Sequence, residues 1–143
     1  MLIGIPSIIS PDLLKILMEM GHGDELVIGD GNFPAVTHAK RLVRSDGHTI
    51  PPLLEAILEL FPLDEYVEKP VALMTVAHGD TTPTPPIWKT YERILENHGH
   101  APCKIDYIDR FTYYDRAKEA FAIVATGESA IYANILLKKG VIK

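Results

Sequence analysis

His22 lies between two glycines in the stretch Gly21-His22-Gly23-Asp24, directly after a segment with helical spacing. A loop bordered by glycines lets a side chain approach a ligand closely. A histidine, whose unperturbed pKa is about 6.5, both donates and accepts protons near neutral pH. The pattern therefore makes His22 a candidate general acid and base. From these residues alone, the alternative is a surface loop histidine without a function.

Asp30 follows the apolar run Glu25–Gly29 and begins the turn Asp30-Gly31-Asn32. Proteins with alternating helices and strands often present a ligand-binding carboxylate where a buried strand ends. This position favours a binding role for Asp30. The alternative is an Asx turn, in which the carboxylate serves only the local backbone.

Tyr132-Ala133-Asn134 precedes another apolar run, Ile135–Leu137. Side chains beside such a run are held rigidly, and a tyrosine hydroxyl with an asparagine amide supplies both donors and acceptors. That combination suits the hydroxyl groups of a sugar. The alternative is a pair of polar residues on the surface of a strand.

Other candidate side chains are weaker. His98 and His100 flank Gly99 at a spacing that suits a metal, but neither a third ligand nor an H-E-x-x-H frame accompanies them. A solvated helix end is the favoured interpretation. His78-Gly79-Asp80 repeats the triplet at 22–24, yet the flanks share nothing else, so we interpret the repeat as coincidence. Cys103, beside Pro102, is predicted to be a packed small apolar residue.

Helical and strand patterns alternate along the chain and must position these residues. A helix is expected from Pro11, capped by Ser10 and ended by Gly21, and further helices over 51–61, 87–97 and 112–120. Short apolar runs predict strands at 25–29, near 42–43, and at 71–76, 105–108, 122–125 and 135–137. Interleaved elements of this kind predict a single α/β domain over 1–143, with a mainly parallel sheet and helices on both faces.

The composition of the chain argues against several classes of function. The chain has 143 residues and a mass of 15.9 kDa, which is enough for one core. Its 14 basic and 19 acidic residues give a net charge of −5, so no basic field is available for nucleic acid or for an anionic membrane. The single cysteine excludes an internal disulfide. With no basic region before the apolar amino terminus and no membrane-spanning apolar run, we expect a cytoplasmic protein.

Cofactor motifs are absent as well. The sequence contains no phosphate-binding loop, no dinucleotide fingerprint and no G-x-S-x-G nucleophile elbow. We therefore expect a site that works with its own side chains, with neither a cofactor nor a metal.

Several motifs together resemble the L-fucose mutarotase and D-ribose pyranase family along essentially the whole chain. The resemblance rests on Met20-Gly21-His22-Gly23-Asp24-Glu25, Asp30 with Phe33-Pro34, Asp109-Arg110-Phe111, Phe121–Val124 with Thr126-Gly127-Glu128, and Tyr132–Val141. Each motif alone is weak, whereas the set is highly specific. The similarity implies an α/β mutarotase domain that forms a ring-shaped homo-oligomer, a decamer, with the Tyr-x-Asn segment near a subunit boundary.

The same resemblance assigns roles to individual residues. It implies that His22 is the catalytic proton donor and that the monosaccharide is bound by Asp30, Arg110, Tyr132, Ala133 and Asn134. Arg110 is typical of the fucose branch, because ribose pyranases carry a histidine at the matching place. Ala133 departs from that branch, in which glycine is frequent, and is typical of ribose pyranases.

These roles agree with the chemistry of anomer exchange, in which a hemiacetal opens when a proton reaches the ring oxygen and another leaves the anomeric hydroxyl. His22 serves this reaction without a cofactor, and positioned acid or base groups contribute about 100- to 10,000-fold. Asp30 either orients the imidazole or holds a sugar hydroxyl, and Tyr132 is the next candidate for proton transfer. The predicted function is L-fucose mutarotation; the alternatives are a D-ribose pyranase and a non-catalytic sugar-binding transport accessory.

The amino terminus is unusually apolar for an exposed segment, with Leu2, Ile3, Ile5, Ile8 and Ile9. A monomer that exposed all of these side chains would carry a costly patch. We therefore expect them at a subunit contact, where a charge at Ile8 or Ile9 would dissociate the particle. The alternative is that they pack on the sheet of their own chain.

Overall fold

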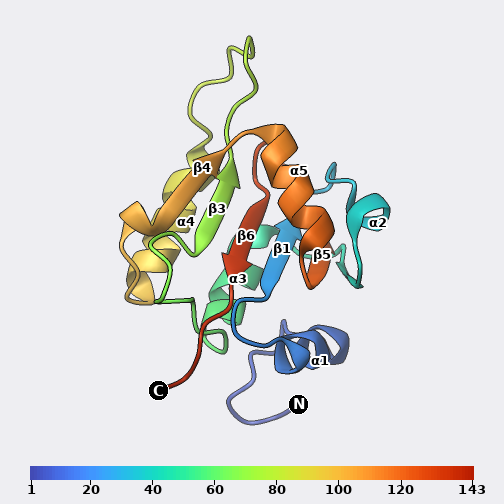
Figure 1. The fold of residues 1–143 in the computed structure, drawn as a ribbon. Helices are drawn as coiled ribbons and strands as arrows, with labels where there is room; N and C mark the ends of the chain where they lie inside the picture. Colours follow the sequence, from blue (N-terminus) through green and yellow to red (C-terminus); the bar gives the residue numbers. More distant parts are fainter.

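Six strands form one sheet in the order β2-β5-β1-β6-β3-β4 (Figure 1). The computed structural model describes residues 1–143. Five strands run in one direction, and β6 runs antiparallel to its two neighbours β1 and β3. The expected mainly parallel sheet is confirmed. The strands are β1 (Glu25–Gly29), β2 (Leu42–Ser45), β3 (Val71–Met74), β4 (Ile105–Ile108), β5 (Ala122–Thr126) and β6 (Ile135–Lys138).

Helix boundaries follow local capping chemistry. Ser10 accepts a hydrogen bond from the backbone N–H of Leu13 at 3.1 Å and begins α1, and Asp109 caps α5 through two backbone N–H groups. The predicted helices are confirmed to within a few residues, although Phe61 lies beyond the end of its helix. The helices are α1 (Pro11–Glu19), α2 (Ala35–His38), α3 (Ile50–Leu58), α4 (Pro86–Asn97) and α5 (Arg110–Glu119), with a short 3-10 helix at Pro102–Lys104.

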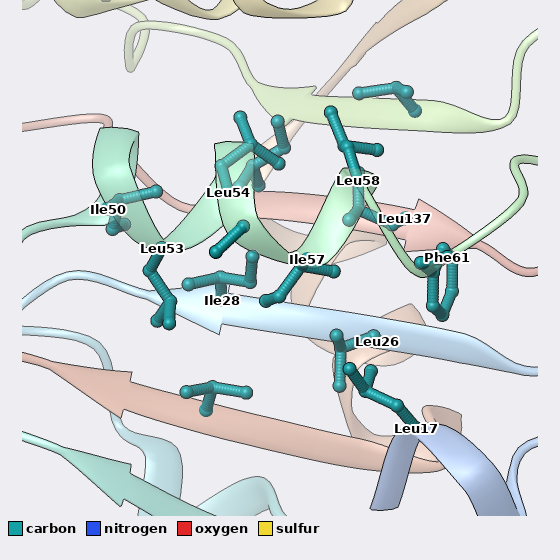
Figure 2. Packing of buried hydrophobic residues seen from close by; sticks show 14 of the residues in the cluster. Leu17, Leu26, Ile28, Ile50, Leu53, Leu54, Ile57, Leu58, Phe61 and Leu137 are labelled. Atoms are coloured by element: carbon teal, nitrogen blue, oxygen red, sulfur yellow. The ribbon is translucent and has the colours of Figure 1, made fainter. Parts of the chain in front are cut away.

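Both faces of the sheet are covered. Strand side chains alternate, so that Leu26 and Ile28 of β1 enter the larger core with α1, α3 and α4, while Val27 enters the smaller core with α2 and α5. Figure 2 shows Leu53 and Ile57 of α3 beside the β1 side chains. The expected helices on both faces are confirmed. The sheet packed between them holds the residues at its two ends in fixed positions.

The amino-terminal segment divides between the core and the surface. Ile9 is 7% exposed and belongs to the larger core, and Ile5 and Ile8 pack partly against it. Leu2 and Ile3 are exposed. The chain's own core therefore takes part of the apolar surface that we expected at a subunit contact. A charge at Ile9 would destabilise the fold itself, so this position cannot test assembly.

Cys103 is exposed, in the 3-10 helix after α4, and the prediction of a packed residue is wrong. No sequence pattern marks that helix, because three residues are too few to show a period.

None of the helices combines the length and the apolar character that a membrane span requires.

Candidate active site

A cavity of about 300 Å³ lies at the sheet end where β1 and β3 finish and β6 begins. The loop between β3 and α4, at the top of Figure 1, contributes to its wall. This is the end at which parallel α/β sheets usually bind ligands. The lining combines the apolar or aromatic residues Phe33, Met74, Tyr114 and Ile131 with the polar residues Asp30, Asn32, Asp80, Arg110, Tyr132 and Asn134.

Asp30 is buried in this wall, with 7% of its surface exposed. Its Oδ1 accepts a hydrogen bond from the backbone N–H of Asn32 at 2.9 Å, so the carboxylate makes the Asx turn and lines the cavity as well. Burial raises the pKa of Asp30, and the charge of Glu128 adds to this effect, while nearby backbone N–H groups oppose it. A hydrogen bond donated by a ligand hydroxyl would therefore stabilise the charged form of this buried carboxylate.

Asn134 is oriented by the backbone of Asp30, the residue that follows β1. Its Oδ1 accepts the backbone N–H of Asp30 at 2.8 Å, across 104 residues of sequence. The residue is 6% exposed, and its amide nitrogen makes no hydrogen bond within the chain. The two amide hydrogens of Asn134 are therefore free to donate to a ligand in the cavity.

Tyr132 has a φ of 55°, a left-handed conformation that is uncommon for any residue but glycine. Its hydroxyl donates to Asp80 Oδ2 at 2.5 Å and accepts from the backbone N–H of Ala77 at 3.1 Å. The hydrogen bond to Asp80 raises the pKa of Tyr132. Because this hydroxyl hydrogen is already engaged, Tyr132 is left to accept a hydrogen bond from a ligand and is a poor source of a proton.

Asp80 is the pocket residue that sequence reasoning passed over, as part of a repeat interpreted as coincidence. Its carboxylate accepts from the side chain and backbone of Thr82 and from Tyr132, and these bonds lower the pKa of Asp80. The only signal in the sequence is its place after β3. A loop after a parallel strand reaches the same sheet end as Asp30.

Arg110 begins α5 and lines the cavity without an ion-pair partner in the chain. Its guanidinium carbon lies 5.2 Å from the centre of the Tyr114 ring. Ala133, by contrast, does not line the cavity. Its side chain is fully buried in the larger core, and its carbonyl accepts a hydrogen bond from the Tyr91 hydroxyl at 2.6 Å.

His22 lies at the opposite end of the sheet from this cavity. It precedes β1 whereas Asp30 follows it, and a five-residue strand spans about 16 Å. His22 is absent from the cavity lining, and its Nε2 lies 3.1 Å from Asp64 Oδ1. Within one chain, therefore, Asp64 and not Asp30 contacts the imidazole.

The remaining histidines form no metal cluster. His98 caps the end of α4, His100 follows a turn, and His78 lines a hollow beside Arg110. The chain contains no group of three or more His, Cys, Asp or Glu side chains placed to hold a metal ion.

The chain belongs to the RbsD / FucU transport protein family, whose model matches residues 3–142. A fucose mutarotase of Mus musculus is 50% identical over 96% of this chain and 92% of its own length. An L-fucose mutarotase of Glaesserella parasuis is 49% identical over 99% of this chain and 96% of its own length.

Solved structures agree with this membership. A fucose mutarotase from Streptococcus pneumoniae, crystallised in complex with L-fucose, matches with a TM-score of 0.95 and 53% identity, covering 99% of this chain and 100% of that one. RbsD from Bacillus subtilis, complexed with D-ribose, matches with a TM-score of 0.69 and 24% identity, covering 94% of this chain and 95% of that one. The similarity to RbsD, at 24% identity, shows a shared fold.

Proposed function

We propose that this protein is a cofactor-independent mutarotase that interconverts the α and β anomers of L-fucose. The observation that carries the proposal is a monosaccharide-sized cavity whose polar groups have assigned hydrogen-bonding directions: donors at Asn134 and Arg110, acceptors at Asp30 and Tyr132. Relatives about half identical over nearly the whole chain are named fucose mutarotases, and a structure with 53% identity holds L-fucose.

The cavity lining suits this sugar. Hydroxyl groups of a pyranose both donate and accept, so they pair with the carboxylate of Asp30 and with the amide hydrogens of Asn134. L-Fucose also carries a methyl group on C5, for which Met74 and Ile131 provide apolar surface. Arg110 donates to ring or hydroxyl oxygens. Ala133 contributes through the backbone position that it gives its two neighbours, because its own side chain points into the core.

The reaction requires two proton movements. As the C1–O5 bond breaks, O5 gains a proton from the imidazolium of His22 and O1 loses a proton to a base, for which the carboxylate of Asp30 is available. Rotation about the C1–C2 bond presents the other face of the carbonyl. Reclosure forms the C1–O5 bond again and returns both protons, so that nothing is consumed.

The separation of His22 from the cavity leads to a proposal on assembly. We infer that subunits join in a ring-shaped homo-oligomer in which His22 of one subunit reaches the cavity of another. Exposed Leu2 and Ile3 supply apolar surface for such contacts. Closed rings repeat one heterologous interface, so every cavity would be completed in the same way. A decamer is the ring size that the family resemblance implies.

Anomer exchange measured by NMR tests the activity. Added protein is expected to increase the rate of α/β interconversion of equilibrated L-fucose above its value in buffer, in proportion to protein concentration. An unchanged rate would refute the enzyme, and fucose binding by calorimetry without faster exchange would identify a sugar-binding accessory instead. The second candidate function is that of a D-ribose pyranase, which the alanine at position 133 favours. The same measurement on D-ribose, following the pyranose and furanose signals, distinguishes it from a fucose mutarotase.

Mixed oligomers test whether the site is shared. His22→Gln and Asp30→Asn subunits, each strongly impaired alone, are expected to regain about a quarter of the wild-type activity when co-assembled in equal amounts, since one cavity in four then receives both intact residues. Light scattering on the same samples checks that a ring has formed. Activity that stays at the level of the separate variants would show that each cavity uses only its own chain.

The cellular site of this activity is proposed to be the cytoplasm. One exposed cysteine and no disulfide are typical of a protein in a reducing compartment.

A further inference from the structure

The loop between β3 and α4, residues 75–85, forms one wall of the cavity without a helix or strand of its own. Thr75, Ala77 and Asp80 line the cavity, and the loop projects beyond the sheet at the top of Figure 1. Beyond Thr75, every hydrogen bond from this loop to a distant part of the chain is made with the hydroxyl of Tyr132. The position of the loop therefore depends on this one group.

The Tyr132 hydroxyl joins two points of the loop. It accepts the backbone N–H of Ala77 at 3.1 Å and donates to Asp80 Oδ2 at 2.5 Å. These two residues are the ends of a turn in which the N–H of Asp80 donates to the carbonyl of Ala77 at 3.0 Å. Gly79, the third residue of the turn, has a φ of 85°, which is typical of a type II turn and favours glycine. One hydroxyl thus holds both ends of this turn.

The carboxylate of Asp80 is oriented by its own loop. Its Oδ1 accepts from the backbone N–H of Thr82 at 2.8 Å and from the Thr82 hydroxyl at 2.6 Å, an Asx turn that leaves Oδ2 for Tyr132. These hydrogen bonds lower the pKa of Asp80, so the group is ionised at neutral pH and can only accept hydrogen bonds. The hydroxyl hydrogen of Tyr132 is therefore held by Asp80 and is not available to a ligand.

The main chain around Tyr132 is fixed by α4. Trp88 donates from Nε1 to the Tyr132 carbonyl at 2.8 Å, and the Tyr91 hydroxyl donates to the next carbonyl, that of Ala133. These bonds support the left-handed φ of Tyr132, a conformation that persists only where the surroundings hold it. With its main chain and its hydroxyl both held, Tyr132 presents its phenol oxygen at a set position in the cavity wall.

We propose that Asp80 is a positioning residue of the sugar site: it takes the hydroxyl hydrogen of Tyr132, which holds the loop at the cavity and leaves the phenol oxygen to accept a hydrogen bond from a sugar hydroxyl. This inference rests on the proposed function, because it assigns the partner of Tyr132 in the ligand. Asp80 acts through Tyr132 and fixes the direction of that hydrogen bond. A ligand group that donates is favoured at this point of the cavity over one that only accepts.

Asp80→Asn reverses the hydrogen bond to Tyr132 while keeping the turn. The two donors of Thr82 hold the amide oxygen in the place of Oδ1, which puts the amide nitrogen, a donor, in the place of Oδ2. The phenol oxygen then accepts from the amide, and its own hydrogen is directed elsewhere. In NMR exchange measurements at varied L-fucose concentration, we expect KM to rise about 2- to 10-fold, the value of one hydrogen bond, with kcat nearly unchanged.

Asp115→Asn is the matched control for this variant. Asp115 is an exposed carboxylate of α5 that makes no hydrogen bond and does not line the cavity. The substitution removes the same charge and is expected to leave KM and kcat unchanged. An equal rise in KM in both variants would assign the effect to net charge and would overturn the positioning role.

A double-mutant cycle separates the positioning role from a direct contact with the sugar. Tyr132→Phe removes the hydroxyl, and in this background Asp80→Asn is expected to change KM less than about twofold, because its effect acts through that hydroxyl. The same rise in KM in both backgrounds would instead assign a direct contact between Asp80 and the sugar. That outcome would overturn the positioning role.

Hydrogen exchange at the Ala77 amide tests the loop contact without any turnover. Its N–H donates to the Tyr132 hydroxyl, so the exchange rate is expected to rise about 2- to 10-fold in Tyr132→Phe. Asp80→Ala removes the acceptor that holds this hydroxyl and is expected to raise the rate as well, whereas Asp115→Asn is not. An unchanged rate in Asp80→Ala would show that the carboxylate does not hold the loop.

The outcomes also separate this proposal from the function on which it rests. Wild-type protein that neither accelerates anomer exchange nor binds L-fucose refutes the mutarotase and the sugar site together. Active wild-type protein whose KM is unchanged in a folded Asp80→Asn variant refutes only the positioning role. Thermal unfolding checks that each variant is folded, which is expected because Asp80 is exposed and lies outside both cores.

Discussion

Replacing His22 with glutamine is expected to lower the catalysed rate of L-fucose anomer exchange by about 100- to 10,000-fold, which is the usual contribution of a positioned general acid and base. Glutamine keeps a polar side chain of similar reach but cannot exchange a proton at neutral pH. NMR exchange measurements on the purified variant give the rate directly. The fold should persist, because His22 lies on an exposed loop and packs little against the core.

His48 provides the matched control for this variant. It too is an exposed loop histidine beside a glycine, and its side chain makes no hydrogen bond and does not line the cavity. His48→Gln is expected to retain full activity. If His22→Gln retained its rate with an unchanged circular dichroism spectrum, the proton transfer would belong to another group, and Asp30 would be the next candidate, since the Tyr132 hydroxyl hydrogen is held by Asp80.

Asp30→Asn is expected to lose activity and gain stability at once. Loss of the charged acceptor for a sugar hydroxyl should reduce kcat/KM about 10- to 100-fold, the worth of a hydrogen bond to a charged group. Asparagine keeps an oxygen for the Asn32 N–H, so the Asx turn survives. Activity by NMR and thermal unfolding of the same preparation measure the two effects.

The expected gain in stability follows from the direction of the pKa shift. Burial raises the pKa of Asp30 in the folded protein above its value in the unfolded chain, so the folded state binds the proton more tightly. Native stability from this group is therefore greatest at low pH and falls as the pH rises through the folded pKa. Above the folded pKa the full cost of the buried charge is present, and the amide removes it.

Comparison across pH distinguishes this cause from a general change in packing. The difference in unfolding temperature between Asp30→Asn and wild type should shrink as the pH is lowered through the acid range, because the wild-type carboxyl then becomes neutral too. Asp46→Asn is the control, since Asp46 is an exposed carboxylate whose pKa is lowered by Arg44. A lower unfolding temperature for Asp30→Asn at neutral pH would contradict the argument.

The local helices and strands, and the position of Asp30 in the site, could be predicted from the sequence. Ser10 and Pro11 mark the start of a helix through capping chemistry that operates within four residues, and apolar runs such as Glu25–Gly29 mark buried strands. Asp30 was placed at the edge of a cavity because a strand end has a known place in a parallel sheet. Interactions between near neighbours in the chain determine all of these features.

The partners of the site residues were decided only by tertiary structure. Asn134 reaches Asp30 across 104 residues, Tyr132 reaches Asp80 across 52, and His22 reaches Asp64 across 42. No local pattern encodes these contacts, because they arise when β6 enters the sheet antiparallel between β1 and β3. That insertion brings the residues before β6 to the cavity and the residues after it to His22.

The sequence by itself thus determined the residue types, the six strands and the four longer helices, together with the family to which the chain belongs. The separation of His22 from Asp30 by the length of β1 was decided by the sheet, since a strand carries its two ends to opposite edges. The identity of the groups that orient each side chain was decided by the packing of distant segments. The physical reason is that secondary structure depends on interactions within a few residues, whereas a site depends on which elements become neighbours in space.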